Sequence, residues 1–308
     1  MLTFAQEREA HERQLEQSRL QQRVSLIQQI QAARGNTPLV VYYSTNVIDD
    51  NEVMNFYQLF SGVGQVDNLD LFLFSYGGLA TDAYKLATLL RQHCKRLGIL
   101  IPYKAKSAGT LVALAGDELV MGPPSELGPI DPQIPVRLRS GEEVWVSAQA
   151  IREGLEFFES RVKGDPEKAL LYSTLVREVS PYIIGQYERE TKASKQYAET
   201  LLEKYQFKGG AERAQWVADR LAAEFYTHGY VIDRVMARDE LTLNVVFAED
   251  VNVWDPMWDL HNLYQLYLRE HPEVGGIAQC VNAQIDLPTS RGSLEAGQRQ
   301  GEPRDERQ

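Results

Sequence analysis

Apolar residues in the first half of the chain form short unbroken runs, and helical periodicity fills the intervals between them. Residues 39–43 and 69–74 are such runs and are rich in β-favouring residues. Unbroken apolar runs of this length are typical of strands that are covered on both faces, as in a parallel sheet. We therefore expect two interior parallel strands at these positions.

The interval after residue 74 has apolar residues at steps of three and four, which predicts a helix that ends near Gly98. The periodic residues are Leu79, Ala83, Leu86, Leu90, Cys94 and Leu97. A strand is expected again at 99–103, a short apolar helix at 107–115, and a further strand at 118–121. This β-α-β-α-β succession favours an α/β fold class with a layered, right-handed core.

The chain beyond residue 121 has a different pattern. Five prolines between residues 122 and 135 fix φ and remove amide donors, which predicts an ordered but irregular loop. A short strand is expected at 144–146, followed by helices at 148–161, 181–205 and 211–225. The C-terminal half is therefore predicted to be mostly helical.

The two ends of the chain differ from the part between them. Helical spacing predicts an amphipathic helix at 5–33, so that residues 1–35 form an arm that packs on the body or mediates oligomerisation. The apolar residues at this spacing include Leu20, Val24 and Ile27. Gly, Arg, Gln, Glu and Pro dominate residues 285–308, which predicts a disordered tail. The domain that carries any chemistry is then 36–284.

Composition narrows the class of partner. A formal net charge of -11 and a pI near 5.1 argue against nucleic-acid or anionic-membrane partners, since both would repel the molecule. The two cysteines, Cys94 and Cys280, lie in no metal-binding spacing, so neither structural zinc nor a disulfide scaffold is expected. The first thirty-five residues contain no apolar run of secretory or membrane-spanning length. We expect a soluble, cytoplasmic protein with no integral membrane segment.

Two strand-to-helix turns carry the candidate chemistry. The first is Ser-Tyr-Gly-Gly at 75–78, and the second begins at Ser107, which opens the short apolar helix. A serine at this place has the following amides and the helix dipole beside it. Gly77, which lacks a Cβ, and Ala108 are each expected to offer an N–H to a tetrahedral oxyanion. The alternative is that Ser107 is a plain N-cap and the two glycines a plain tight turn.

These features occur in an order that resembles a known superfamily. Ser-Tyr-Gly-Gly is followed by Lys-Ser-Ala-Gly-Thr at 106–110 and by the glycine- and proline-rich run at 116–133. The succession resembles the Clp-protease and crotonase superfamily, and most of all the serine dehydrogenase proteinase family, which is related to signal peptide peptidase A. The resemblance covers about 39–244 and is most specific at 69–133.

The resemblance implies a fold, an activity and a site. The implied fold is a Clp-protease/crotonase-like layered β-α-β spiral core with a helical C-terminal half. The implied activity is that of a serine peptidase that needs no cofactor or metal, acts on a peptide or protein substrate and assembles as a homo-oligomer. Ser107 corresponds to the nucleophile, and Gly77 and Gly78 correspond to the turn that builds the oxyanion hole.

Two positions depart from the superfamily pattern. Tyr76 stands where Clp-type relatives have proline, which puts the shape of the entrance to the oxyanion hole in doubt. The histidine base of Clp proteases falls near Ile130 and Asp131 in this chain, and a carboxylate does not replace imidazole in that role without a raised pKa. A triad with the Clp order is therefore disfavoured, and Asp131 is expected mainly to accept backbone donors in the loop.

Relatives of signal peptide peptidase A use a serine–lysine dyad, which turns attention to the helix expected at 181–205. Counting from its first proline points to Lys192, whereas helical periodicity places Lys195 on the apolar stripe. A base lysine needs a lowered pKa, which an apolar stripe favours, so Lys195 is slightly preferred. Lys192 follows Glu188 by four residues, the spacing of an ordinary helix ion pair.

His228 is the remaining base candidate, in Thr-His-Gly-Tyr-Val-Ile, although this position is also typical of a helix C-terminus. Two other functions stay open. In a crotonase-like acyl-thioester enzyme or binder, the same amides would stabilise an enolate. A catalytically inactive oligomeric assembly module would use the N-terminal helix and the C-terminal half to recruit partners.

Overall fold

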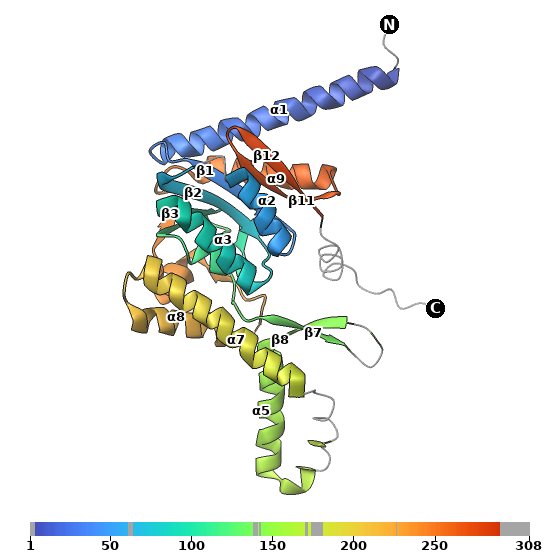
Figure 1. Ribbon diagram of the computed structural model, residues 1–308, viewed down its shortest axis with the longest axis vertical. Coiled ribbons are helices and arrows are strands. Elements are labelled where there is room, and N and C mark those ends of the chain that lie inside the picture. Colours follow the sequence, from blue (N-terminus) through green and yellow to red (C-terminus); the bar gives the residue numbers. More distant parts are fainter. Residues whose placement is uncertain are drawn as a thin grey trace.

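The computed structural model describes residues 4–60, 64–137, 141, 143–169, 172–173, 181–225 and 227–289. Its centre is a ten-stranded mixed sheet with the strand order β10-β5-β3-β2-β1-β11-β12, to which β4, β6 and β9 are joined at one end. Strands β10, β5, β3, β2 and β1 are parallel, whereas β11 runs antiparallel to β1 and β12 antiparallel to β11 (Figure 1). The bounds of these strands are β1 (Leu39–Ser44), β2 (Val66–Ser75), β3 (Cys94–Ile101), β5 (Glu118–Met121), β10 (Val245–Phe247), β11 (Val274–Cys280) and β12 (Ala283–Pro288).

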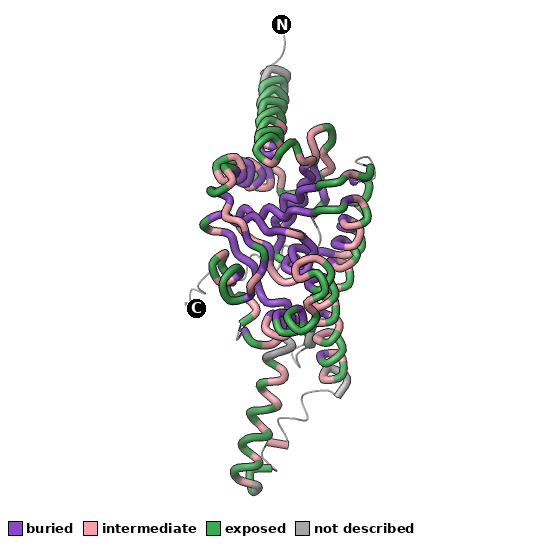
Figure 2. The backbone as a smooth tube through the Cα atoms, turned by 90° about the vertical axis from the view of Figure 1, so that its left-hand side faces the viewer, coloured by how far each residue is buried: buried purple, intermediate pink, exposed green. Residues whose placement is uncertain are grey.

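Helices cover both faces of this sheet, which explains the unbroken apolar runs in its central strands. Alternate residues of β1 contribute to two separate cores: Val40 and Tyr42 lie in one, and Val41 and Tyr43 in the other. Helices α2, α3, α4, α7 and α8 supply the first core, and α1 and α9 the second. In Figure 2 the buried residues therefore follow the central strands, and exposed residues lie mainly on the helices outside them. The bounds of these helices are α1 (Phe4–Ala33), α2 (Asp50–Phe60), α3 (Ala80–His93), α4 (Ala108–Ala113), α7 (Pro181–Leu201), α8 (Ala211–Ala223) and α9 (Trp254–Glu270).

Three two-residue strands extend the sheet at the carboxyl end of β2. Ser75 of β2 pairs with Ala105 of β4, Ala105 with Leu127 of β6, and Leu127 with Ile232 of β9. This ladder brings four distant stretches of chain side by side, and the loops that follow or precede these residues share one edge. The bounds are β4 (Lys104–Ala105), β6 (Glu126–Leu127) and β9 (Ile232–Asp233).

A hairpin, the helix that follows it and the first part of α7 extend away from the body. Strands β7 and β8 form a separate antiparallel pair, and α5 follows directly and points away from the central sheet, beside the first part of α7 (Figure 1). A single turn of π-helix, η2, continues α7, and η3 precedes β10. The bounds are β7 (Gln133–Arg137), β8 (Glu143–Ser147), α5 (Ala148–Gly164), η1 (Pro166–Lys168), η2 (Leu202–Gln206) and η3 (Met236–Glu240).

The N-terminal helix packs on the body by its second half only. Arg23, Ile27 and Ile30 are buried, and α1 contacts α9, whereas the first half extends away from the molecule (Figure 1). The packed half agrees with one of the two readings of the predicted arm. Oligomerisation through the extended half stays a prediction.

The predicted alternation of parallel strands and helices is confirmed over residues 39–121, with shifted bounds. The crossover helix ends at His93 rather than near Gly98, because residues from Cys94 onward already pair with β2. The proline-rich segment is not wholly irregular, since it contains β6 and the start of β7. The prediction of a mostly helical C-terminal half missed four strands, β9, β10, β11 and β12. The predicted boundary at 284 falls inside β12, because Leu287 is buried on β11, and residues 290–308 lie outside the described residues.

Candidate active site

Gly77 lies directly against Ser107. A Cβ on Gly77 would come within 2.7 Å of Ser107 Cβ, 2.9 Å of the Lys106 carbonyl oxygen and 3.2 Å of the Ala108 nitrogen. The Lys106 N–H donates to the carbonyl of Ser75 at 3.0 Å, which ties the two turns together. The two strand-to-helix turns identified in the sequence are therefore adjacent, and Ser107 itself is half-buried.

The backbone of Ser107 is strained. Its φ of 51° and ψ of -118° fall in a region that L-residues with a Cβ rarely adopt. A residue in such a conformation typically costs on the order of 1–3 kcal/mol, and such outliers gather at functional sites. The neighbouring backbone accepts this geometry through the Gly109 N–H to Lys106 carbonyl bond of 2.7 Å and the start of α4. No side-chain cap bond accompanies Ser107, which argues against the plain N-cap reading.

The diglycine turn is fixed by a bridge to Ile48. The Ile48 N–H donates to the Gly77 carbonyl at 2.9 Å, and the Leu79 N–H donates to the Ile48 carbonyl at 2.8 Å. A Cβ on Gly78 would lie 2.7 Å from Ile48 Cα and would overlap the Ile48 backbone. Only glycine fits at this position, since the contact is with backbone that has no side chain to move.

The amides around Ser107 differ in their partners. The Gly77 N–H donates to Ser75 Oγ at 3.0 Å, so this predicted oxyanion donor is already bonded. Within the described part of the chain, the Gly78 N–H and the Ala108 N–H have no acceptor. The two unbonded amides therefore belong to the residues that directly follow Gly77 and Ser107 in the chain.

Asp131, His228 and Ser147 form a cluster at the same edge of the sheet. His228 Nδ1 lies 2.9 Å from Asp131 Oδ1, and Ser147 Oγ donates to Asp131 Oδ2 at 2.7 Å. Asp131 is buried, whereas 24% of the His228 side chain is exposed. A carboxylate at Nδ1 favours the tautomer with the proton on Nδ1, in which Nε2 is a proton acceptor. From the sequence, Asp131 and His228 were two separate candidates, and in the structure they are hydrogen-bonded to each other.

The ladder explains why Ser107 and this cluster share an edge. Ala105 pairs with Leu127, and Leu127 pairs with Ile232. Ser107 follows Ala105 by two residues. Asp131 follows Leu127 and His228 precedes Ile232 by four residues each, so the antiparallel pairing of Leu127 with Ile232 brings Asp131 and His228 to the same side of the pair. Lys106 links the three segments, since its Nζ donates to the carbonyls of Leu127 at 3.1 Å and Tyr230 at 2.9 Å.

Lys106 was not among the candidate bases, although burial lowers its pKa. The Glu126 carboxylate, 3.2 Å from Nζ, and the two carbonyls surround its ammonium group. Through these contacts the Lys106 side chain connects the end of β4 to β6 and to the segment that precedes β9. A lone lysine beside a serine gives no sequence signal for such a role.

Both lysines proposed as the base are paired on the helical surface. Lys192 Nζ lies 3.1 Å from Glu188, and 77% of its side chain is exposed, as the ordinary ion-pair reading predicts. Lys195 pairs with Asp219 of α8 and lies 3.6 Å from Glu199. The hydrogen bond with Asp219 raises the pKa of Lys195, with a further rise from the charges of Asp219 and Glu199 that outweighs the effect of burial. The lowered pKa expected from the apolar stripe is therefore wrong, because α8 places a carboxylate beside that stripe.

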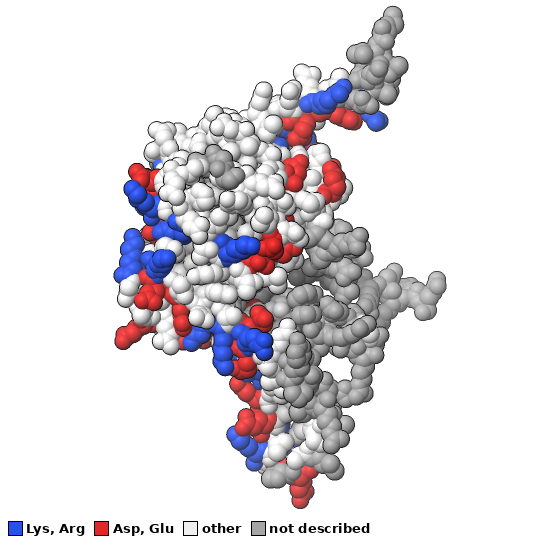
Figure 3. All heavy atoms as spheres, viewed as in Figure 1, with Lys and Arg blue, Asp and Glu red and all other residues white. Residues whose placement is uncertain are grey.

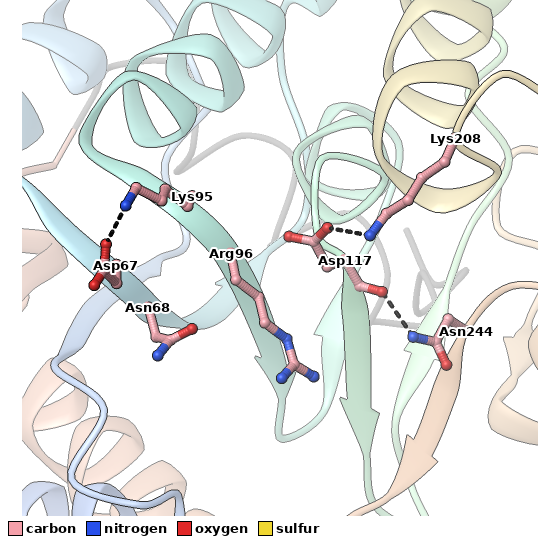
Figure 4. Close-up of a pocket in the computed structure, with 7 residues that line it drawn as sticks. All are labelled: Asp67, Asn68, Lys95, Arg96, Asp117, Lys208 and Asn244. Carbon is pink, nitrogen blue, oxygen red and sulfur yellow. Dashed lines mark hydrogen bonds and ion pairs between the residues drawn. The ribbon is translucent and has the colours of Figure 1, made fainter.

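A pocket of about 420 Å³ lies at the opposite end of the strands (Figure 4). It is lined by the amino-terminal residues of β2 and β3 and by residues next to β5 and β10, namely Asp67, Asn68, Lys95, Arg96, Asp117, Lys208 and Asn244. Its cations are paired: Lys95 with Asp67, Lys208 with Asp117, and Arg96 with Glu118. The face drawn in Figure 3 likewise mixes basic and acidic side chains. None of these lining residues is a serine, threonine or cysteine, and the pocket lies at the end of β2 opposite the edge that holds Ser107.

Sequence comparison agrees with the geometry of the two turns. Residues 1–140 match the family described as ClpP-like SDH-type serine proteinase. These residues, which are just under half of the chain, are similar to that serine proteinase family. The resemblance stated from the motifs is thus confirmed, and the matched residues include Gly77, Gly78, Ser107 and Asp131.

Two relatives of this chain occur in Methanocaldococcus jannaschii. Uncharacterized protein MJ1495 is 27% identical over 270 residues, which cover 83% of this chain and 81% of the relative. Uncharacterized protein MJ0137 is 30% identical over 207 residues, which cover 67% of this chain and 62% of the relative.

Solved structures with similarity to this chain include two mutants of the 1510-N membrane-bound stomatin-specific protease. The lysine-to-alanine mutant in complex with a substrate peptide has 15% sequence identity and a TM-score of 0.42, and covers 82% of this chain and 86% of its own. The serine-to-alanine mutant has the same identity and TM-score and covers 73% of this chain and 82% of its own. Among the described residues of this chain, every helix is too short or too polar to cross a membrane.

Proposed function

We propose that this chain is a serine peptidase in which Ser107 Oγ attacks the carbonyl carbon of a peptide bond. The observation that carries the proposal is the strained backbone of Ser107, which packs against Gly77, while the amides of the next residues, Gly78 and Ala108, have no acceptor among the described residues. The similarity of residues 1–140 to a serine proteinase family supports the same reaction.

The Gly78 and Ala108 N–H groups hold the oxyanion in this proposal. Gly78 takes the place expected for Gly77, because the Gly77 amide is bonded to Ser75. Donors aimed at the developing oxyanion stabilise the transition state by about 3 kcal/mol each. Gly77 serves instead as the surface without a side chain on which Ser107 rests.

His228 is the general base that we favour, and Asp131 orients it. His228 Nε2 takes the proton as Ser107 Oγ forms a bond to the carbonyl carbon, and then gives that proton to the departing amine. Water attacks the acyl-enzyme in the second half of the reaction, and the same imidazole accepts its proton and returns it to Ser107. The contact that supports this assignment is the 2.9 Å pair of His228 and Asp131. A serine–lysine dyad with Lys195 or Lys192 is the alternative.

A fluorophosphonate probe tests the proposal on the full chain. We expect one covalent adduct, located at Ser107 by mass spectrometry, and loss of both labelling and ester or peptide hydrolysis in Ser107→Ala. Ser160→Ala is the matched control, because Ser160 lies on an exposed face of α5. Labelling of another residue, or unchanged hydrolysis by Ser107→Ala, would contradict the proposal and favour the thioester or assembly hypothesis.

A further inference from the structure

Glu52 is a buried carboxylate outside the proposed catalytic groups. It lies in the first turn of α2, is only 4% exposed, and accepts three side-chain hydrogen bonds. The donors are Tyr42 Oη at 2.8 Å, Ser44 Oγ at 3.1 Å and Asn46 Nδ2 at 2.7 Å. A buried carboxylate with three donors is specific in geometry, since each lost donor leaves an unpaired polar group.

Asn46 connects this carboxylate to the segment after β1. Its Nδ2 also donates to the Pro288 carbonyl at 2.9 Å, and its backbone N–H donates to Ser44 Oγ at 3.1 Å. A Cβ on Gly275 of β11 would overlap the Asn46 side chain. Asn46 is thereby held from α2, β11 and β12 at once, which fixes the path of the chain toward Ile48.

Ile48 passes this constraint to the candidate oxyanion hole. It lies two residues after Asn46, is fully buried, and makes both backbone bonds that hold Gly77 and Leu79. The amide of Gly78 lies between those two bonds, so its direction depends on where the Ile48 backbone lies. Glu52, Asn46, Ile48 and Gly78 form a continuous series of contacts that ends at an amide beside Ser107.

We propose that Glu52, acting through Asn46 and Ile48, is a positioning residue that aims the Gly78 N–H at the oxyanion. This inference rests on the proposed function. It predicts that breaking the Glu52–Asn46 hydrogen bond slows the chemical step while substrate binding changes little, because the oxyanion forms only during reaction.

A double-mutant cycle tests the coupling. Glu52→Gln leaves one acceptor oxygen for three donors that now approach two, and Asn46→Asp sets two carboxylates against each other. The double variant Glu52→Gln/Asn46→Asp pairs one amide donor with one carboxylate acceptor again. We expect each single variant to lower kcat and the rate of fluorophosphonate labelling about tenfold, with KM changed less than about twofold. The double variant should recover part of both rates.

Asp70→Asn is the matched control. Asp70 is also a buried carboxylate, but it lies in the first half of β2 and pairs with Arg34, away from Ser107. Its variant is expected to lower the unfolding temperature without lowering kcat of the folded protein. If Glu52→Gln or Asn46→Asp does not fold, Ser44→Ala removes one donor to Glu52 and provides a milder version of the same test.

Hydrogen exchange of the Ile48 and Leu79 amides gives a readout that does not need activity. Faster exchange at both amides in Glu52→Gln, together with slower labelling, would support the proposal. Unchanged exchange, or a loss of kcat equal to that of Asp70→Asn, would overturn it. A wild-type protein that is inert toward the probe would contradict the peptidase proposal and the catalytic role of Glu52, while the exchange rates would still decide whether Glu52 holds the turn.

Discussion

Gly77 and Ser107 are packed so closely that a methyl group on Gly77 would lie 2.7 Å from Ser107 Cβ. Gly77 also has φ of 117°, in the region that favours glycine. We expect Gly77→Ala to displace Ser107 and to lower fluorophosphonate labelling by about a hundredfold, as a misplaced reacting group does. Labelling rates, compared at equal folded fraction by circular dichroism, measure this effect.

Gly35→Ala is the control that separates the effect of the Gly77–Ser107 contact from the effect of a side chain at a positive φ. Gly35 has φ of 68°, and no atom lies within 4 Å of the position of its Cβ. This control should lose about 1 kcal/mol of stability from backbone strain alone and keep the wild-type labelling rate. A Gly77→Ala protein that labels as fast as Gly35→Ala would show that Ser107 does not depend on this packing.

The identity of the base gives a second prediction. We expect His228→Gln to lower kcat by about a hundredfold to ten-thousandfold, and Asp131→Asn to lower it in the same direction. Lys195→Met should leave kcat within about twofold, because its ammonium is paired with Asp219. Steady-state hydrolysis of one ester substrate by all three variants makes the comparison. An inactive Lys195→Met protein beside an active His228→Gln protein would instead favour the serine–lysine dyad.

The first half of the fold could be predicted because each of its strands is covered on both faces. Burial on two faces makes residues 39–43 of β1 and 71–74 of β2 an unbroken apolar run each, and this signal does not depend on distant residues. The β11–β12 hairpin gave no such signal. Gly275 and Gly276 are poor strand formers by residue type, yet they lie in a strand because the side chains of Asn46 and Ser44 occupy the space beside them. That reason becomes visible only in three dimensions.

The candidate site divides in the same way. Ser107 and the two glycines belong to local turns, so their residue types and spacing identified them. His228 and Asp131 are 97 residues apart in the sequence, and only the β6–β9 pairing brings them together. The apolar stripe that favoured Lys195 does exist, since Ala198 and Leu202 are buried. The sequence pattern of one helix gave no sign of the carboxylate that α8 places beside Lys195.

The burial of His261 leads us to expect that the protein loses stability in mild acid. It is buried among aromatic rings and bonded to Tyr43 Oη, and burial lowers its pKa from 6.5 to about 4. The unfolded chain therefore binds the extra proton between these pH values. The stabilisation is fully present above pH 6.5 and is lost as the pH falls toward 4, with a magnitude of about 3 kcal/mol.

Urea unfolding at pH 7.5 and pH 4.5 measures this effect. We expect His261→Gln to be less stable than the wild type at pH 7.5, because it packs less well against Trp258, but to lose less stability on acidification. Equal losses in the two proteins would assign the acid sensitivity to other groups.

Arg34 joins the end of α1 to two buried carboxylates of the sheet. Its Nε donates to Asp70 at 2.9 Å, and its Nη2 donates to Glu118. Burial raises the pKa of Asp70, which shows that this site tolerates a carboxylate poorly without its partner. We expect Arg34→Met to destabilise the protein by about 3–5 kcal/mol, because it leaves buried charge uncompensated.

Arg96→Met is the comparison, since Arg96 also pairs with Glu118 but is 58% exposed at its side chain. Exposed pairs of this kind contribute at most about 1 kcal/mol. Adding Asp70→Asn to Arg34→Met should restore part of the lost stability, because it removes one of the unpaired charges. Denaturant unfolding of the four proteins measures these free energies. If the two arginine variants lost equal stability and Asp70→Asn gave no recovery, the buried network would not be what anchors α1 to the sheet.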